Sequence, residues 1–153
     1  MAAPLPKVPR LRNGIVAVLI NEAGLVLMAE RSDALGSWQF PQGGVENGES
    51  ETQAFFRELG EELGNDSCEI LKTGAHKIAY LWPKPGRDYD GQDQTWFLAR
   101  FRMGEEPHLA ESDGCFRAWK WEDPAKVLEQ TLDWKRAAFR EGLVLLGLIE
   151  ESG

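Results

Sequence analysis

The chain has 153 residues, a length that suits one domain with its own core, and neither its apolar share of 42% nor its charged share of 27% fits a mainly disordered protein. Its formal net charge of −8 disfavours a broad basic surface for nucleic acid, so duplex DNA is not an expected partner. Acidic proteins can still handle phosphates through divalent metal ions, and the charge therefore does not exclude a nucleotide substrate.

A membrane partner is not expected either, because the longest apolar runs, residues 14–20 and 143–149, are too short to cross a bilayer. The first ten residues contain three prolines and no apolar stretch, so they do not resemble a signal peptide. Two cysteines, Cys68 and Cys115, do not make a disulfide framework. We therefore expect a cytoplasmic protein in a reducing compartment. Nothing in the sequence indicates the oligomeric state.

The chain begins with a loose, proline-rich lead over residues 1–9, and we expect one domain over residues 10–150. Apolar and β-branched residues predict a buried strand at residues 14–20. A turn separates this strand from a second one at residues 25–29, so the two are expected to form a hairpin.

After a polar loop, residues 38–40 predict a short strand, and the chain should leave regular structure at Pro41-Gln42-Gly43-Gly44. The second half predicts one or two strands within residues 70–82, a loop over 83–94, strands over 95–102 and 116–121, a short helix over 124–129 and a long amphipathic helix over 132–149. Because strands come before and after the first helix, the predicted class is α+β, with a central mixed sheet in an α/β/α sandwich.

The clearest helix is predicted at residues 50–63. Ser50 and Gln53 have the spacing of a capping box, and Gly64 is a natural C-terminal stop. The apolar residues of this helix share one sector, which should face the core. They are Phe55, Phe56, Leu59 and Leu63.

Three glutamates, Glu58, Glu61 and Glu62, fall within a sector of about 100° on the same helix. Like charges this close repel one another, so a helix that keeps them indicates a cation to be held. Carboxylate oxygens suit Mg²⁺ or Mn²⁺, which bridge to substrate phosphates. The alternative interpretation is a solvated acidic face without a ligand.

The residues before the helix favour the metal-binding interpretation. Gly43 and Gly44 allow the backbone to approach a ligand closely. Arg57 could pair with Glu49 and fasten the preceding loop to the helix. The fixed positions are Gly43, five residues, Glu49, seven residues, Arg57-Glu58, Leu59, one residue, Glu61-Glu62, one residue and Gly64.

This pattern resembles the Nudix box, and it departs from it only at Asn65, where the family usually has an aliphatic residue. The resemblance implies a Nudix-like fold and a hydrolase of nucleoside diphosphates linked to another group. It further implies metal binding by the three glutamates and the Gly43 carbonyl, with Glu49 and Arg57 as the supporting pair. Attack by a water that a carboxylate activates would then cleave a phosphoanhydride bond.

Motifs outside the box resemble the branch that contains bacterial RNA 5′-pyrophosphohydrolases and plant-type diadenosine tetraphosphate hydrolases. These motifs are residues 37–44, Tyr80, residues 91–97, residues 119–121 and residues 134–136. The expected substrate is an RNA 5′-triphosphate end, and the alternative is a dinucleoside polyphosphate. A pyrophosphatase for nucleoside triphosphates or sugar nucleotides, and a non-catalytic nucleotide-binding module, are less favoured.

This branch commonly has a further glutamate that completes the metal site, and Cys115 stands at that position here. A thiol is a poor ligand for Mg²⁺. Asp113 or Glu111 could replace the glutamate through a loop shift, or the helix glutamates could suffice alone. We expect the second arrangement, which leaves the number of metals and the identity of the base open.

Substrate binding requires positive charge near the phosphates. Arg31, which follows the second strand, and Lys135, at a basic position of the branch, are the favoured candidates, and each could instead be a surface cation. Gln42, beside Gly43, is a further candidate. Tyr80 could stack on a base or could be a half-buried sheet aromatic. The other cations considered are Arg12, Lys77, Lys84 and Arg136.

Overall fold

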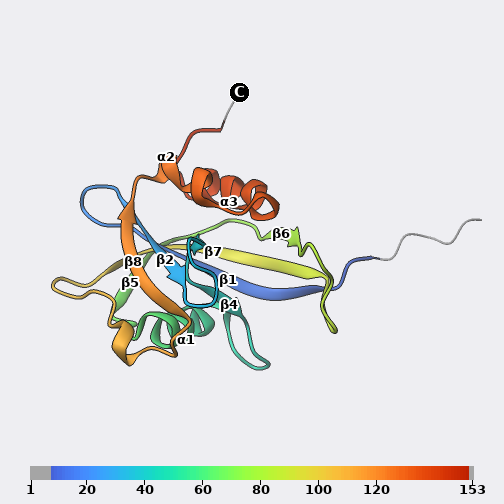
Figure 1. Cartoon of the computed structure of the whole chain (residues 1–153), viewed down its shortest axis with the longest axis horizontal. Helices are drawn as coiled ribbons and strands as arrows, with labels where there is room; N and C mark the ends of the chain where they lie inside the picture. The colour runs from blue at the N-terminus through green and yellow to red at the C-terminus, as the bar shows by residue number, and fades with distance from the viewer. Residues whose placement is uncertain (1–7, 152–153) are drawn as a thin grey trace, which may run out of the picture.

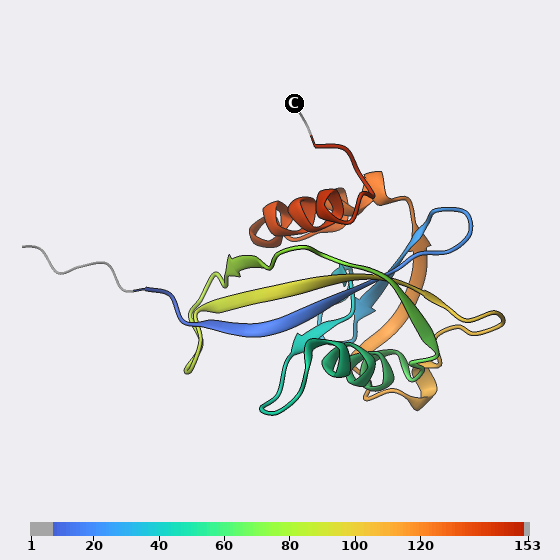
Figure 2. The same ribbon diagram turned by 180° about the vertical axis from the view of Figure 1, so that it is seen from behind.

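Three layers form the part of the chain that the computed structural model describes, residues 8–151 (Figure 1). Helix α1 (Glu51–Leu63) covers one side of the strands and helix α3 (Asp133–Leu145) covers the other, as the view from behind also shows (Figure 2). The arrangement confirms the predicted α+β class and the α/β/α sandwich. Of the predicted loose lead, residues 1–7 lie outside the described residues.

Eight strands and short helical segments complete the described chain. They are β1 (Leu11–Leu19), β2 (Val26–Arg31), β3 (Trp38–Gln39), β4 (Gln42–Gly44), β5 (Cys68–Thr73), β6 (Ile78–Leu81), β7 (Gly91–Phe101), the 3-10 turn η1 (Leu109–Glu111), β8 (Phe116–Glu122), α2 (Pro124–Val127) and the 3-10 turn η2 (Leu128–Gln130).

The central sheet is mixed, with the order β4-β1-β7-β5 and with β6 paired to β7. β1 and β7 run parallel, and the other pairs are antiparallel. The second sheet is antiparallel, with the order β3-β2-β8. Two sheets therefore share the middle layer, and the mixed one carries the segment that precedes α1.

The predicted hairpin of β1 and β2 is wrong. The two strands belong to different sheets, and within the described residues they share the isolated bridge between Ile20 and Val26. β1 already uses both of its edges for β4 and β7, while β2 uses its edges for β3 and β8. Alternation and turn chemistry predicted both strands, but they do not report which partners fill the two edges.

Strand pairing also explains two differences from the predicted elements, at residues 42–44 and at the start of β7. Residues 42–44 form the edge strand β4 against β1, where irregular structure was expected; Pro41 lies before this strand, so its missing N–H breaks no ladder bond. β7 begins at Gly91, earlier than predicted, because residues 91–94 pair with β6 as well as with β1. A long partner strand thus extends a segment whose own residues suggest a loop.

The helix ends follow local chemistry. Ser50 and Gln53 form the predicted capping box, and Gly64 ends α1 in the left-handed conformation at φ 71°. The predicted long C-terminal helix stops at Leu145, and Gly147 follows with φ 78°. The short helix predicted over residues 124–129 divides into α2 and η2.

The core has two halves, one on each side of the strands. Ala54, Phe55, Leu59 and Leu63 of α1 are fully buried in one half, while Phe56 packs only at its edge. Phe40, Trp96 and Phe139 form a cluster of rings in the other half, beneath α3. Both cysteines are free thiols, as expected. Within residues 8–151, no helix is long and apolar enough to cross a membrane.

A close approach of α3 to β7 generates a stability prediction. A Cβ atom on Gly142 would lie 2.4–2.5 Å from three ring atoms of buried Trp96. We expect Gly142→Ala to cost about 1–3 kcal/mol, because a buried indole cannot move aside freely. In a chain of this size that lowers Tm by about 2–4 °C per kcal/mol.

The matched control is Gly60→Ala in α1, where an added Cβ meets nothing within 4 Å. Alanine is the better helix former, so this variant should gain up to about 1 kcal/mol. Thermal unfolding of both variants checks the prediction. Equal Tm values for the two would contradict the packing described for α3.

Candidate active site

Arg57 organises the approach to helix α1. Its Nε and Nη2 donate to the two carboxylate oxygens of Glu49 at 2.7 and 2.9 Å, and Nη2 also donates to the Gly44 carbonyl at 2.7 Å. These bonds fasten the loop before the helix to the helix itself, as the sequence predicted. The Arg57 guanidinium lowers the pKa of Glu49 to about 2, so this carboxylate is charged at neutral pH.

The remaining nitrogen of the guanidinium faces the acidic sector. Nη1 donates to Glu58 at 2.8 Å and to Glu61 at 3.3 Å. Glu58 in turn lies against Gly43: a Cβ on Gly43 would fall 2.1 Å from the Glu58 carboxyl carbon. The glycine is therefore needed for the close approach of β4 to this carboxylate.

Glu62 is the most buried of the three helix glutamates, with 5% of its surface exposed. Its Oε1 accepts a hydrogen bond from the backbone N–H of Gln42 at 2.9 Å, and the Cys115 thiol donates to its Oε2 at 3.7 Å. Burial, reinforced by the charge of Glu58, raises the pKa of Glu62 to about 8. Without a compensating cation this carboxyl group is mostly protonated at neutral pH.

The donor set fits a hard divalent cation. Carboxylates and a backbone carbonyl are the ligands that Mg²⁺ prefers, and burial, the first cause of the raised pKa of Glu62, disfavours its charged form in the absence of a cation. Within residues 8–151 no three acidic, histidine or cysteine side chains stand arranged to hold an ion. In this arrangement Arg57 supplies the positive charge beside Glu58 and Glu61 instead.

The loop after η1 lies against the C-terminal end of α1. The Asp113 N–H donates to the Glu61 carbonyl at 2.7 Å, which brings Asp113 and Cys115 next to Glu62. The Asp113 carboxylate accepts from the Cys115 N–H at 2.9 Å and so closes its own turn. Glu111 is exposed and lies 3.9 Å from His108. Of the two acids considered in this loop, only Asp113 is near the glutamates.

Of the two favoured basic residues, Arg31 lies near the acidic group and Lys135 lies near Arg31. Arg31 pairs with Asp33 at 2.6–2.7 Å, and its charge acts on Cys115 and Glu62. Lys135 is 8% exposed and donates to Gln39 at 3.3 Å. Burial, together with the charge of Arg31, lowers the pKa of Lys135 to about 8. Arg31 thus stands between the glutamates and Lys135.

The other cations are distributed differently. Arg12 lies at the site, since its guanidinium packs 2.3 Å from where a Cβ of Gly44 would be. Lys77 bonds to Asn13 and Glu51, and Arg136 donates to backbone carbonyls of residues 128 and 131, so both are engaged elsewhere. Arg12 lies two residues before Gly14 on the same face of β1, and the pairing of Gly14 with Gly44 brings it to the site.

Tyr80, a candidate for base stacking, pairs with Trp134, with ring centroids 5.7 Å apart. Tyr80 is only 8% exposed and its hydroxyl accepts from Gln92 at 3.0 Å, whereas Trp134 is 38% exposed. Trp134, not Tyr80, therefore offers a ring to a ligand. The motif around Trp134 was noted in the sequence, but a tryptophan on an amphipathic helix gives no sign that its ring stays exposed.

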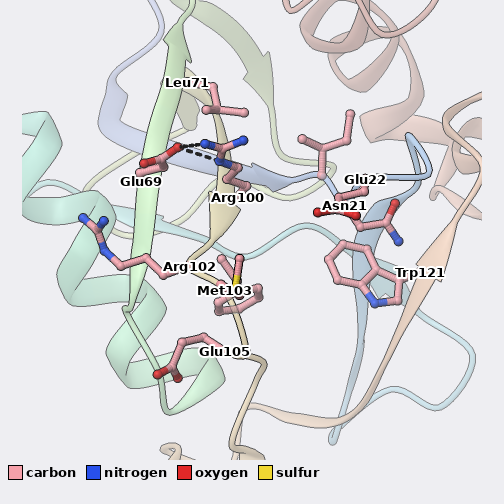
Figure 3. Close-up of a pocket in the computed structure, with 12 residues that line it drawn as sticks. Asn21, Glu22, Glu69, Leu71, Arg100, Arg102, Met103, Glu105 and Trp121 are labelled. Carbon is pink, nitrogen blue, oxygen red and sulfur yellow. Dashed lines mark hydrogen bonds and ion pairs between the residues drawn. The ribbon is translucent and has the colours of Figure 1, made fainter.

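A cavity of about 660 Å³ lies beside this ring and is lined by Trp38, Trp134 and residues 129–133. Another, of about 620 Å³, opens between the two sheets and is lined by Trp121, Leu71 and Met103 (Figure 3). In the second cavity Arg100 is paired with Glu69, and none of the three helix glutamates reaches it. The candidate active site at α1 and β4 therefore lies outside both of these cavities.

A substitution of Arg57 can show whether this residue stabilises the loop before α1 or contacts the substrate. Lysine cannot make the paired contact with Glu49 and also reach Gly44, Glu58 and Glu61. We expect Arg57→Lys to lower Tm by at least about 3 °C and to lower activity with it. The exposed Arg100, paired only with Glu69, gives the control Arg100→Lys, which should match wild type. Unchanged stability with a raised KM would assign Arg57 to substrate instead.

Comparison with known proteins agrees with this geometry. The model of the NUDIX domain matches residues 10–143. Nudix hydrolase 25 of Arabidopsis thaliana is 38% identical over 91% of this chain and 87% of its own length. An RNA pyrophosphohydrolase of Erythrobacter litoralis is 35% identical over 86% and 87%, and one of Helicobacter pylori is 34% identical over 86% and 90%.

Solved structures share the fold at lower identity. The E. coli dihydroneopterin triphosphate pyrophosphohydrolase superimposes with a TM-score of 0.65 at 23% identity, covering 90% of this chain and 99% of that one. A C. elegans Ap4A hydrolase gives a TM-score of 0.61 at 21% identity, covering 88% and 97%. Because the family model matches residues 10–143 of this chain, the chain belongs to the Nudix family and is a hydrolase that acts on pyrophosphate bonds.

Proposed function

We propose that this Nudix hydrolase is an RNA pyrophosphohydrolase, which cleaves a phosphoanhydride bond at the 5′-triphosphate end of RNA with the help of Mg²⁺, which Mn²⁺ could replace. Glu58, Glu61, Glu62 and the Gly43 carbonyl would hold the ion, and Arg57 with Glu49 would keep these ligands in place. When bound, the ion polarises phosphoryl oxygens and offsets the charge that develops during bond cleavage. The assignment is supported by the contact of one Arg57 nitrogen with both Glu58 and Glu61, and by the close approach of Gly43 to Glu58.

The protein's own contribution to the reaction is to activate and direct water. Glu61 is the most accessible of the three glutamates, with 49% of its side chain exposed, so it is the carboxylate that water reaches most readily. It accepts the proton as the water oxygen forms a bond to one phosphorus. The bridging P–O bond breaks on the opposite side, and the leaving phosphate departs with the bridging oxygen.

An exposed ring beside a lysine supports the assignment to a nucleotide end. Trp134 is 38% exposed, and the Lys135 ammonium lies 5.0 Å from the centre of its ring. A base can stack on such a ring whatever its identity, while Lys135 and Arg31 offset the charge of the phosphates. Gln42, whose side-chain oxygen accepts from Gln94, would offer its amide nitrogen to the same phosphates.

The names of the relatives favour RNA over other substrates. RNA pyrophosphohydrolases match this chain at 34–37% identity over most of its length. The net charge of −8 argues against a long RNA footprint, but an end-specific enzyme needs to hold only a few nucleotides. A dinucleoside polyphosphate such as diadenosine tetraphosphate is the alternative substrate.

A substrate panel tests the assignment. We expect a short 5′-triphosphate RNA, in Mg²⁺, to show kcat/KM at least about tenfold above diadenosine tetraphosphate, nucleoside triphosphates and ADP-ribose, a preference that one good extra contact provides. Chelation should abolish turnover, and Glu62→Gln should reduce it at least about a hundredfold. Faster hydrolysis of diadenosine tetraphosphate would overturn the assignment of RNA as the substrate. Activity that survives chelation would overturn the proposed need for a divalent metal ion.

Lys135 should govern the alkaline side of the pH profile. Because its pKa is lowered to about 8, the ammonium loses its proton, and its attraction for phosphate, as the pH rises through that value. We expect wild-type kcat/KM to fall above about pH 8. Lys135→Arg keeps its charge and should move this limb to higher pH, while the exposed Lys126→Arg should leave it in place. If kcat/KM falls at the same alkaline pH in all three proteins, Lys135 does not bind phosphate.

Lys135 should affect folding stability in the opposite direction: stability should rise with pH where kcat/KM falls. A lysine with a lowered pKa in the folded state binds fewer protons than in the unfolded chain between about pH 8 and pH 10.4. Stability from this group therefore increases as the pH rises through that window. Lys135→Met should lack the increase, and denaturant titrations at pH 7.5 and 9.5 measure it. A wild-type protein without that gain would contradict the burial of a titrating amine.

The late carboxylate should not be required. Asp113 uses its carboxylate to accept from the Cys115 N–H, a bond that asparagine can keep, and Glu111 faces His108. We expect Asp113→Asn and Glu111→Gln to keep kcat within about threefold under saturating Mg²⁺, and Cys115→Glu to tighten metal binding. A loss beyond about tenfold in either acid variant, together with loss of the acidic limb, would make that acid the base.

A further inference from the structure

The second glutamine of the Gln92-Asp93-Gln94 run has no role in the reaction described above. Gln94 lies in β7 opposite Gly14 of β1 and Ile78 of β6, and its side chain is fully buried. Glutamine is rarely buried unless its amide is fully bonded. Its presence in the middle of the central sheet therefore requires an explanation.

The amide of Gln94 uses only its donor side. Nε2 donates to Gln42 Oε1 at 2.8 Å and makes a longer contact of 3.4 Å with Gln92 Oε1. Its Oε1 is buried and has no hydrogen-bond partner among residues 8–151. A core side chain without polar atoms would avoid that cost, so the fold keeps an unfavourable group for the bond that it makes to Gln42.

That bond decides how Gln42 presents its amide. A carboxamide has its acceptor and its two-hydrogen donor on opposite branches of one plane. With Oε1 directed to Gln94, the Nε2 branch must point elsewhere, and among residues 8–151 nothing accepts from it. Gln42 is only partly buried, and its backbone N–H holds Glu62 at 2.9 Å. The free donor therefore belongs to a residue in direct contact with the acidic group.

We propose that Gln94 is a positioning residue of this hydrolase, which holds the Gln42 carboxamide so that its Nε2 donates to a phosphate oxygen of the substrate. The proposal rests on the proposed function, because it assigns Gln42 to phosphate. If Gln94 were absent, the Gln42 amide would be free to turn and to present its oxygen, which repels a phosphate. The bond to Gln94 removes that orientation before the substrate binds.

A double-mutant cycle tests this indirect role. Gln94→Met keeps the length of the side chain and removes its hydrogen bonds, and Gln42→Ala removes the group through which Gln94 is proposed to act. We expect Gln94→Met to raise KM about tenfold with kcat within about threefold, the size of one charge-assisted hydrogen bond. In the Gln42→Ala background the same change should have no further effect.

Stability provides the readout that separates positioning from folding. Because Gln94→Met removes an unpaired buried acceptor, its Tm should stay within a few degrees of wild type. Effects that multiply in the double variant would overturn the proposal, as would an unchanged KM in Gln94→Met. A fall in Tm without a change in KM would show a structural role only. The cycle uses whichever anhydride the wild type hydrolyses fastest, so it remains valid if RNA is not the substrate.

A measurement on the wild-type protein covers the case in which Gln94→Met does not fold. The side-chain amide signals of Gln42, identified by their loss in Gln42→Ala, are followed by ¹⁵N NMR during titration with a non-hydrolysable nucleotide analogue. We expect the Gln42 NH₂ signals to shift and the buried Gln94 NH₂ signals to stay in one slowly exchanging state. Gln42 signals that do not respond to saturating analogue would overturn the proposal.

Discussion

The bonds of Arg57 are the constraint on which the rest of the site depends. One guanidinium donates to Glu49, to the Gly44 carbonyl, to Glu58 and to Glu61, and so connects the loop, the edge strand β4 and the helix α1. Its planar set of donors suits this task because each nitrogen has a fixed direction. The same bonds place positive charge beside two carboxylates that would otherwise repel each other at short range.

Glu62 extends this arrangement into the sheet. It lies beyond the reach of Arg57's bonds and is held instead by the Gln42 N–H and the Cys115 thiol. Burial without a cation makes its charged form unfavourable, and a divalent ion would restore that form. Gln42 contacts Glu62 through its backbone N–H and Gln94 through its side-chain oxygen, so one residue of β4 joins the acidic group to the central sheet. The hard ion and the phosphates would thus bind to a framework that is already ordered.

Features that depend on local spacing could be predicted from the sequence. Features that depend on which strands pair could not. Ser50, Gln53 and Gly64 fixed the ends of α1, and the pairing of Arg57 with Glu49 followed from their positions. The expected hairpin was wrong because alternation cannot show that β1 and β2 fill their edges with other strands. The roles suggested for Arg12, Trp134 and Gln94 likewise depend on neighbours distant in sequence, and no local pattern distinguishes an exposed tryptophan or a buried glutamine from the common case.

The central claim is that the helix glutamates, held by Arg57, form the cation site of this hydrolase. Direct binding of Mn²⁺, followed by its EPR signal in the absence of substrate, tests it without reference to turnover. We expect Glu58→Gln and Glu62→Gln each to weaken the tightest site at least about tenfold, while Glu105→Gln, on the loop after β7, binds as wild type does. Equal Mn²⁺ affinity in all four proteins would contradict the account.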